Sequence, residues 1–123
     1  MTNVEIIKTK YDLEERTAKF AEEIVKFAGT IPKNPVTIPL ITQLVKAGTS
    51  VGANYCEADD AESRKDFVHK LGIAKKEARE TKHWLRLISV ANSDLSEVAK
   101  IHWQEAKELH LIFNAIINST NKR

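Results

Sequence analysis

The residues best suited to chemistry form a row of positive charge. Lys75, Arg79, Lys82 and Arg86 are spaced by four, three and four residues. At about 100° per residue, this spacing keeps them within about 60° of arc on a helix, and about 100° from the apolar face of the same segment, so they should face water. We call these four residues the basic stripe. Such a row suits the phosphates of a nucleic-acid backbone, with strong salt dependence and little base preference. The alternative is a solvated face that serves only solubility.

Positive charge is concentrated around the stripe. The 123 residues include 19 Lys or Arg and 17 Asp or Glu, for a net charge of +2. Residues 64–86 carry eight basic and three acidic residues, so this segment is +5 and the remaining chain is −3. An anionic partner responds to this local charge rather than to the total.

Catalytic chemistry is harder to support. A di-iron site in a helical bundle needs two Glu-x-x-His motifs from different helices and two further glutamates. Glu80 and His83 form one such motif, but no other helix supplies a second, and His83 falls on the basic side of its segment. Cys56 is the only cysteine, and we expect a small buried thiol rather than a nucleophile. We therefore predict no catalytic residue, no metal and no cofactor.

Four amphipathic segments must position these residues. Apolar residues recur at helical spacing and predict helices over about 12–28, 39–57, 64–91 and 95–118 of a single domain, residues 1–123. Short connections favour antiparallel neighbours, hence an all-α, up-down-up-down four-helix bundle. The first residues have no apolar signal core, and no apolar run approaches the roughly 18 residues that span a bilayer. We expect a cytoplasmic protein without membrane contact.

Two local signals refine the helices. Ser63 with Asp66, and Asp94 with Glu97, are capping patterns for the third and fourth helices. The tail that follows residue 117 is polar and should fray.

Two glycines inside the second helix need a reason, because each costs a helix about 1 kcal/mol. Gly48 and Gly52 are four residues apart, with Ala47, Ser50 and Ala53 around them. A phosphate loop would need a preceding strand and a Lys-Ser/Thr pair, and this stretch has neither. The small-residue face instead predicts a close helix–helix contact.

A second row on the third helix runs Ile73, Glu77, Glu80, Trp84 and Leu87. Tryptophan is enriched at interface hot spots, so Trp84 is a candidate anchor for a neighbouring subunit. Equally, this row could pack against a helix of the same bundle.

Four polar residues fall on or near packing faces: Asn54, Glu57, Glu80 and His102. Buried polar groups need partners, so we expect some of these side chains to bond each other across the bundle.

The stretch TSVGANYCEADDAESRKDFVHKLGIAKKEARETKHWLRLI, residues 49–88, carries a family pattern. The pattern is Ser-x-Gly-Ala-Asn-x-x-Glu, then Ser-x-x-Asp-Phe, then an alanine-rich helix with a central Glu. The matching residues are Ser50, Gly52, Ala53, Asn54, Glu57, Ser63, Asp66, Phe67, Ala74 and Glu80. The chain thereby resembles the bacterial four-helix bundle proteins first described as reading frames inside intervening sequences of 23S ribosomal RNA genes.

The resemblance implies a left-handed antiparallel bundle that often assembles as a homopentamer, and no established activity. The accessory variability proteins of diversity-generating retroelements are similar in fold, and these basic pentamers associate with nucleic acid and reverse transcriptase. We accordingly predict a non-enzymatic scaffold that forms a homo-oligomeric ring and binds RNA or DNA backbone through the basic stripe. The alternative is a protein–protein interaction module with no nucleic-acid role.

Overall fold

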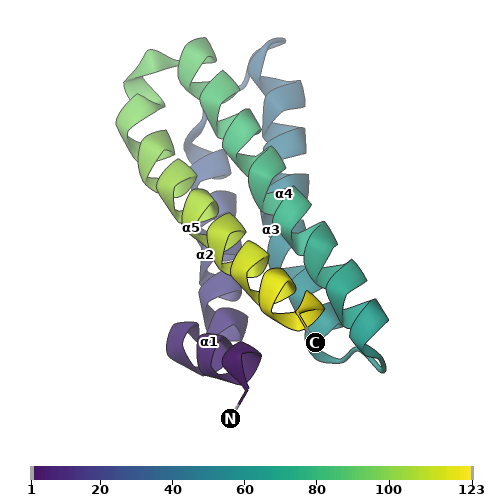
Figure 1. Cartoon of the computed structure of the whole chain (residues 1–123). Coiled ribbons are helices and arrows are strands. Elements are labelled where there is room, and N and C mark those ends of the chain that lie inside the picture. Colours follow the sequence, from purple (N-terminus) through teal and green to yellow (C-terminus); the bar gives the residue numbers. More distant parts are fainter. Residues whose placement is uncertain (1, 123) are drawn as a thin grey trace.

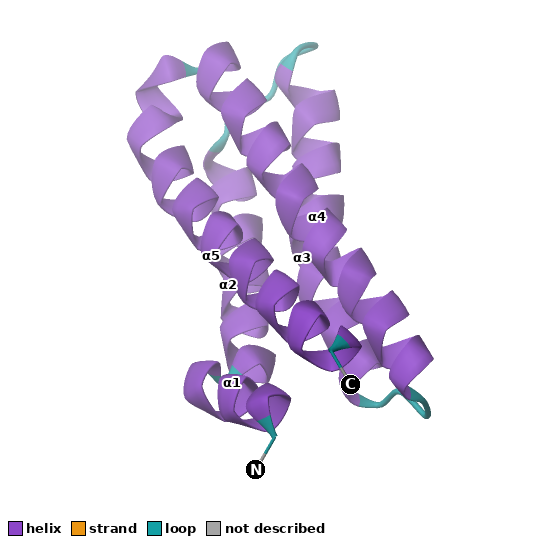
Figure 2. Ribbon diagram, in the orientation of Figure 1, coloured by secondary structure: helices purple, strands orange, loops and turns teal. Residues whose placement is uncertain are grey.

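The computed structural model describes residues 2–122, apart from the side chains at positions 8 and 9, and is helical with no strand in that range (Figures 1 and 2). Its elements are α1 (Asn3–Tyr11), α2 (Leu13–Thr30), α3 (Thr37–Asp59), α4 (Arg64–Ala91), a 3-10 turn η1 (Ser93–Leu95) and α5 (Ser96–Asn121). The first and last residues of the predicted domain lie outside the described range. Within that range, no helix is both long and apolar enough to cross a membrane.

The four long helices run in alternating directions and pack as a bundle (Figure 1). α4 makes extensive contacts with both α3 and α5, and α2 packs on α3, whereas α2 and α5 touch little. The bundle is therefore open along the side between α2 and α5. The four predicted helices are confirmed, and the largest difference in bounds is at the end of α5, residue 121 rather than 118.

The sequence prediction missed a fifth helix, α1. Its N-terminus has a reciprocal capping box, in which the Glu5 amide donates to Thr2 Oγ1 and the Thr2 amide donates to Glu5 Oε2, both at 3.1 Å. Asp12, in the left-handed region with φ 42°, separates α1 from α2. The helix is short, and only three of its apolar residues, Val4, Ile7 and Tyr11, recur at spacings of three and four. Its contact with α5 and the core, through Val4 and Ile7, is non-local.

One of the two predicted caps is present. Ser63 caps α4, because its hydroxyl accepts a hydrogen bond from the Asp66 amide at 3.0 Å. The predicted cap at Asp94 is wrong: α5 begins at Ser96, and its N-cap position is taken by Leu95, which makes no side-chain cap. The 3-10 turn places Asp94 one residue before the N-cap position of α5.

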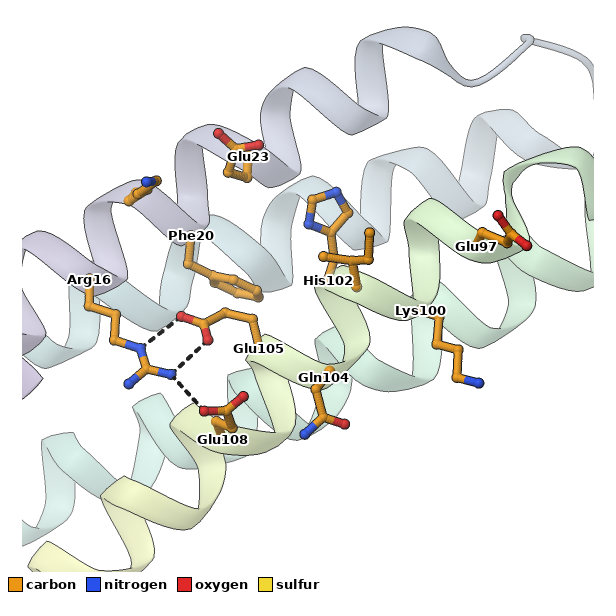
Figure 3. A pocket seen from close by; sticks show the side chains of 11 residues that line it. Arg16, Phe20, Glu23, Glu97, Lys100, His102, Gln104, Glu105 and Glu108 are labelled. Carbon is orange, nitrogen blue, oxygen red and sulfur yellow. Dashed lines mark hydrogen bonds and ion pairs between the residues drawn. The ribbon is translucent and has the colours of Figure 1, made fainter.

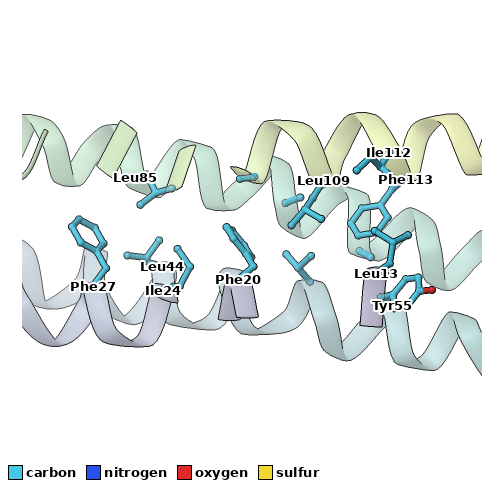
Figure 4. Close-up of a cluster of buried hydrophobic side chains, with 14 of the residues drawn as sticks. Leu13, Phe20, Ile24, Phe27, Leu44, Tyr55, Leu85, Leu109, Ile112 and Phe113 are labelled. Carbon is cyan, nitrogen blue, oxygen red and sulfur yellow. The ribbon is translucent and has the colours of Figure 1, made fainter. Parts of the chain in front are cut away.

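The core lies along the inner faces of α2–α5, with a contribution from the start of the chain (Figure 4). The apolar row that the spacing predicts for α4 begins at Phe67, which is only partly buried. The rest of the row is fully enclosed, at 0–1% exposure for Leu71, Ala74, Ala78, Thr81, Leu85 and Ile88. The rings of Tyr55 and Phe113 stack with centroids 6.2 Å apart at one end of this core.

The small-residue face of α3 is confirmed as a close contact with α2. A Cβ placed on Gly48 would lie 2.7 Å from Ile24 Cγ2, which is shorter than van der Waals contact. A Cβ on Gly52 would lie 3.3 Å from the carbonyl oxygen of Thr17. The two helices approach as closely as they do because position 48 carries no side chain.

We predict that Gly48→Ala destabilises the protein by about 1–2 kcal/mol. Overpacking against the stiff β-branched Ile24 costs about 1–3 kcal/mol, which exceeds the gain in helix propensity of up to about 1 kcal/mol. Urea denaturation followed by circular dichroism measures the change.

The matched control is Gly72→Ala, because a Cβ on Gly72 in α4 would meet nothing within 4 Å. This variant should gain up to about 1 kcal/mol from helix propensity alone. Equal stabilisation in both variants would show that Ile24 does not hold α3 at contact distance.

Candidate nucleic-acid interface

The packing of α4 places the basic stripe beside α5. Lys75 Nζ donates a 2.8 Å hydrogen bond to Asn114 Oδ1, and Lys82 Nζ lies 5.3 Å from the ring centroid of Trp103. Both lysines are partly buried, whereas Arg79 is exposed. The expectation that the whole stripe faces open water is therefore correct for its arginines and wrong for its lysines, because α5 packs over that edge of α4.

The stripe keeps its positive charge. Among residues 2–122, none of its four cations has a carboxylate within the 4.0 Å of a salt bridge. The ion pairs formed by Arg16 and by Lys26 lie on other parts of the surface. Because Asn114 is neutral, its hydrogen bond positions Lys75 without cancelling the charge.

A hollow of about 710 Å³ crosses the outer side of α4, from α3 to α5. We call it the α4 hollow, and its lining residues are Gln43, Lys76, Arg79, Glu80, Lys82, His83, Trp84, Arg86 and Trp103. Three cations of the basic stripe thus share one surface depression with two indole rings. Sequence reasoning did not anticipate Trp103, which approaches the stripe from a different helix.

His110 of α5 lies within the field of the stripe. Its pKa is lowered by burial, and further by the charges of Lys82, Lys75 and Arg79. Its Nδ1 is buried without a hydrogen-bond partner in the described chain. The imidazole is therefore neutral at neutral pH, and its protonation would add a further positive charge close to the stripe.

The second row of α4 faces α3. Glu77 is partly buried, and its pKa is raised first by burial and then by Glu80, with Lys76 and Lys46 of α3 opposing the shift. Trp84 is partly buried and packs against the core of its own bundle. The sequence left open whether this row packs within its own bundle or against a neighbouring subunit. The structure shows the contact within the bundle, and the part of Trp84 that stays exposed lines the α4 hollow.

The family-pattern residues serve packing and local hydrogen bonding. Ser50 donates to the carbonyl of Lys46 at 2.6 Å, and Asn54 Nδ2 donates to the carbonyl of Ser50 at 2.9 Å. Both bonds lie within α3. Gly52 is buried against α2, and Phe67 is partly buried against the core.

The expected polar network across the bundle is wrong. Glu57 and Glu80 are exposed to solvent, and Asn54 is satisfied within its own helix. His102 packs on Phe27 with ring centroids 5.1 Å apart, and burial lowers its pKa. The two glutamates are exposed to solvent, Asn54 bonds to the backbone and His102 contacts an aromatic ring. None of the four side chains therefore requires a hydrogen bond to another of them.

Cys56 is exposed, which corrects the expectation of a buried thiol. Its pKa is nevertheless raised, first by partial desolvation and then by nearby acids, of which Glu14 and Asp59 are the strongest. A thiol with a raised pKa is a weak nucleophile at neutral pH. Within residues 2–122, no three His, Cys, Asp or Glu side chains gather closely enough to hold a metal ion.

A second cavity, of about 900 Å³, follows the open side between α2 and α5 (Figure 3). Arg16 bridges it, with Nε 2.8 Å from Glu105 Oε2 and Nη2 2.7 Å from Glu105 Oε1, and a further contact of 3.2 Å to Glu108. These hydrogen bonds raise the pKa of Arg16. Because Arg16 and Glu105 are 89 residues apart, no local pattern could have revealed this clamp.

Fold and surface together define a helical-bundle protein with one strongly basic face. The model of the 23S rRNA-intervening sequence protein family matches residues 9–115, and the chain belongs to this family. The resemblance inferred from the pattern in residues 49–88 is thereby confirmed.

A solved structure supports the same relationship. The chain is similar to a protein of unknown function from the S23 ribosomal protein family of Bacteroides thetaiotaomicron, known from its crystal structure. The two are 32% identical, with a TM-score of 0.79 over 86% of this chain and 95% of that one. Comparison with functionally curated proteins gave no significant match.

We predict that Lys82→Met raises the pKa of His110. A neighbouring cation disfavours the imidazolium form, so its removal makes protonation easier and moves the titration to higher pH. The ring C–H signals of His110, followed by NMR between acidic and neutral pH, report this pKa directly.

Lys100→Met is the control, because Lys100 is exposed and lies ten residues, about 15 Å, from His110 along α5. It should leave the titration in place. An unchanged His110 pKa in Lys82→Met would mean that the stripe does not act on this histidine.

Proposed function

We propose that this protein is a non-enzymatic scaffold that binds the backbone of RNA or DNA through the basic stripe. The observation that carries the proposal is the unneutralised charge of Lys75, Arg79, Lys82 and Arg86 on one face of α4. Unpaired lysine and arginine displace the counterions of a polyanion, and this release drives non-specific binding.

The size of the stripe fits a strand of nucleic acid. Eleven residues separate its ends, which is about 16 Å along a helix. Phosphates recur about every 3.4 Å along the axis of one strand, so the stripe spans about five of them. Four cations in this length match the charge density of the ligand.

The same proposal includes a homopentameric ring, which the family resemblance implies. Large apolar side chains stay exposed on the two helices that border the open side: Val25 of α2 at 51%, and Val98 and Ile101 of α5 at 45% and 67%. Exposed apolar residues of this size mark interaction surfaces when they cluster. The partly exposed Trp84 is a further interface candidate. A ring would repeat the basic stripe in each subunit and raise the avidity for a long strand.

A protein–protein interaction module without a nucleic-acid role is the second candidate. The exposed apolar residues that support a ring support this function equally, and the stripe would then serve solubility. An enzymatic role has less support. His102 is engaged with Phe27, and the thiol of Cys56 has a raised pKa, so this histidine and this cysteine give little support to nucleophilic catalysis.

We predict that Lys75→Gln/Arg79→Gln/Lys82→Gln/Arg86→Gln loses binding to nucleic acid. The slope of log affinity against log salt should decrease by up to about 3, since each phosphate contact to a single strand contributes about 0.7. Fluorescence anisotropy of a labelled RNA at several salt concentrations measures both quantities.

The charge-matched control is Lys19→Gln/Lys26→Gln/Lys33→Gln/Lys100→Gln, which removes four exposed lysines outside the stripe. It should retain most of the affinity and slope. If both variants weaken binding equally, only net charge matters and the stripe is not the site. If the unaltered protein binds no nucleic acid at low salt, the interaction module is the better function.

We predict that the unaltered protein is an oligomer, with a solution mass several times the 13.9 kDa of one chain. Ile101→Asp should reduce this mass. A buried charge at a subunit contact is costly, so the substitution should favour dissociation. Val90→Asp is the control, because Val90 is 79% exposed at the end of α4, away from the open side. A monomeric mass for the unaltered protein in multi-angle light scattering would exclude the ring.

A further inference from the structure

We propose that the ligand of the basic stripe is single-stranded, and that one of its bases stacks on the indole of Trp103. This inference rests on the proposed nucleic-acid function and specifies its ligand. Trp103 combines three features: an aromatic face, a fixed orientation and cations from two helices.

The orientation of Trp103 is fixed by the bundle. The ring is partly buried and packs against the hydrophobic core, while part of it lines the α4 hollow. A ring held by core packing loses little conformational freedom when a ligand stacks on it. Trp103 is therefore a preformed platform rather than a mobile surface side chain.

Two ammonium groups lie over this indole. Lys82 Nζ of α4 is 5.3 Å from the ring centroid, and Lys107 Nζ of α5 is 5.7 Å from it. Neither lysine has a carboxylate partner among the described residues. The electron-rich ring thus holds two cations that have no carboxylate partner in the described part of the chain.

This arrangement suits a nucleotide, which carries an anionic phosphate and an aromatic base. Lysine is a flexible point charge, so the ammonium of Lys82 or Lys107 can move off the Trp103 ring and bind a phosphate of the ligand. The vacated face of the indole can then take the base. Arg79 and Arg86, exposed on the same side of α4, are placed to contact the flanking phosphates.

The platform selects single strands over duplexes. In a duplex, base faces are stacked on one another, and only the phosphates and the groove edges are available to the protein. A single strand can present a base face to Trp103 and its phosphates to the stripe at once. Both kinds of ligand use the cations, but only the single strand uses the indole.

The test compares Trp103→Leu with the unaltered protein on two probes, a short oligouridine strand and a short duplex RNA. The substitution should weaken oligouridine binding about tenfold, as expected for the loss of one stacked base, and leave duplex affinity and both salt slopes unchanged. Trp103→Phe keeps an aromatic face and should recover most of the single-strand affinity. Circular dichroism and thermal melting of both variants verify the fold.

A second measurement, tryptophan fluorescence, leaves the Trp103 ring in place. The chain has two tryptophans, so Trp84→Phe leaves Trp103 as the single indole. Its fluorescence should be quenched by oligouridine and remain largely unchanged with the duplex. Because this variant keeps Trp103, it reports stacking even if Trp103→Leu does not fold.

The outcomes separate this inference from the proposed function. If the protein binds both probes equally and Trp103→Leu changes neither affinity, the stripe binds backbone alone and the stacking platform is wrong. The same conclusion follows if Trp103→Leu and Trp103→Phe weaken both probes to the same extent. If neither probe binds at low salt, the proposed function fails together with the inference.

Discussion

Burial of the apolar row of α4 is the constraint on which the rest of the structure depends. Leu71, Ala78 and Leu85 are fully enclosed because α4 packs on α3 along one side and on α5 along the other. Since side chains advance by about 100° per residue, the orientation of this row also fixes where every other side chain of α4 points. The basic stripe lies beside α5 for this reason. A requirement of the core thus determines the chemistry of the surface.

The bundle is unequally packed, and the cavity between α2 and α5 follows from that inequality. α3 packs closely on α2 where Gly48 meets the side chain of Ile24 and Gly52 meets Thr17, so one side is closed by small residues. The side between α2 and α5 stays open and is bridged by Arg16 and Glu105. A partly exposed ion pair contributes little to stability, so this bridge adds little to the packing of the two helices. On the far side, the wide outer surface of α4 carries the stripe.

The sequence predicted the long helices because their signals are local. Periodic apolar residues, the Ser63 cap and the paired glycines each act within a few turns, and all three were correct. The errors have different causes. α1 depends on contacts with α5, the cap of α5 was displaced by a 3-10 turn, and Cys56 faces solvent because its neighbour Tyr55 takes the core position. The exposure of Cys56 follows from the helical spacing of Val51, Tyr55 and Ala58, whereas the contacts of α1 and the turn before α5 depend on other elements.

The candidate site also combines features that the sequence predicts with features that only the fold determines. By itself, the sequence determined that Lys75, Arg79, Lys82 and Arg86 share one helical face, because the geometry of a single helix sets their relation. Only the tertiary structure decided what stands beside them: Asn114 contacts Lys75 across 39 residues of chain, and Trp103 and His110 reach Lys82 from α5. The register between two helices depends on how all four long helices fill the core, and a property of the whole bundle cannot be determined from the spacing of residues within one segment.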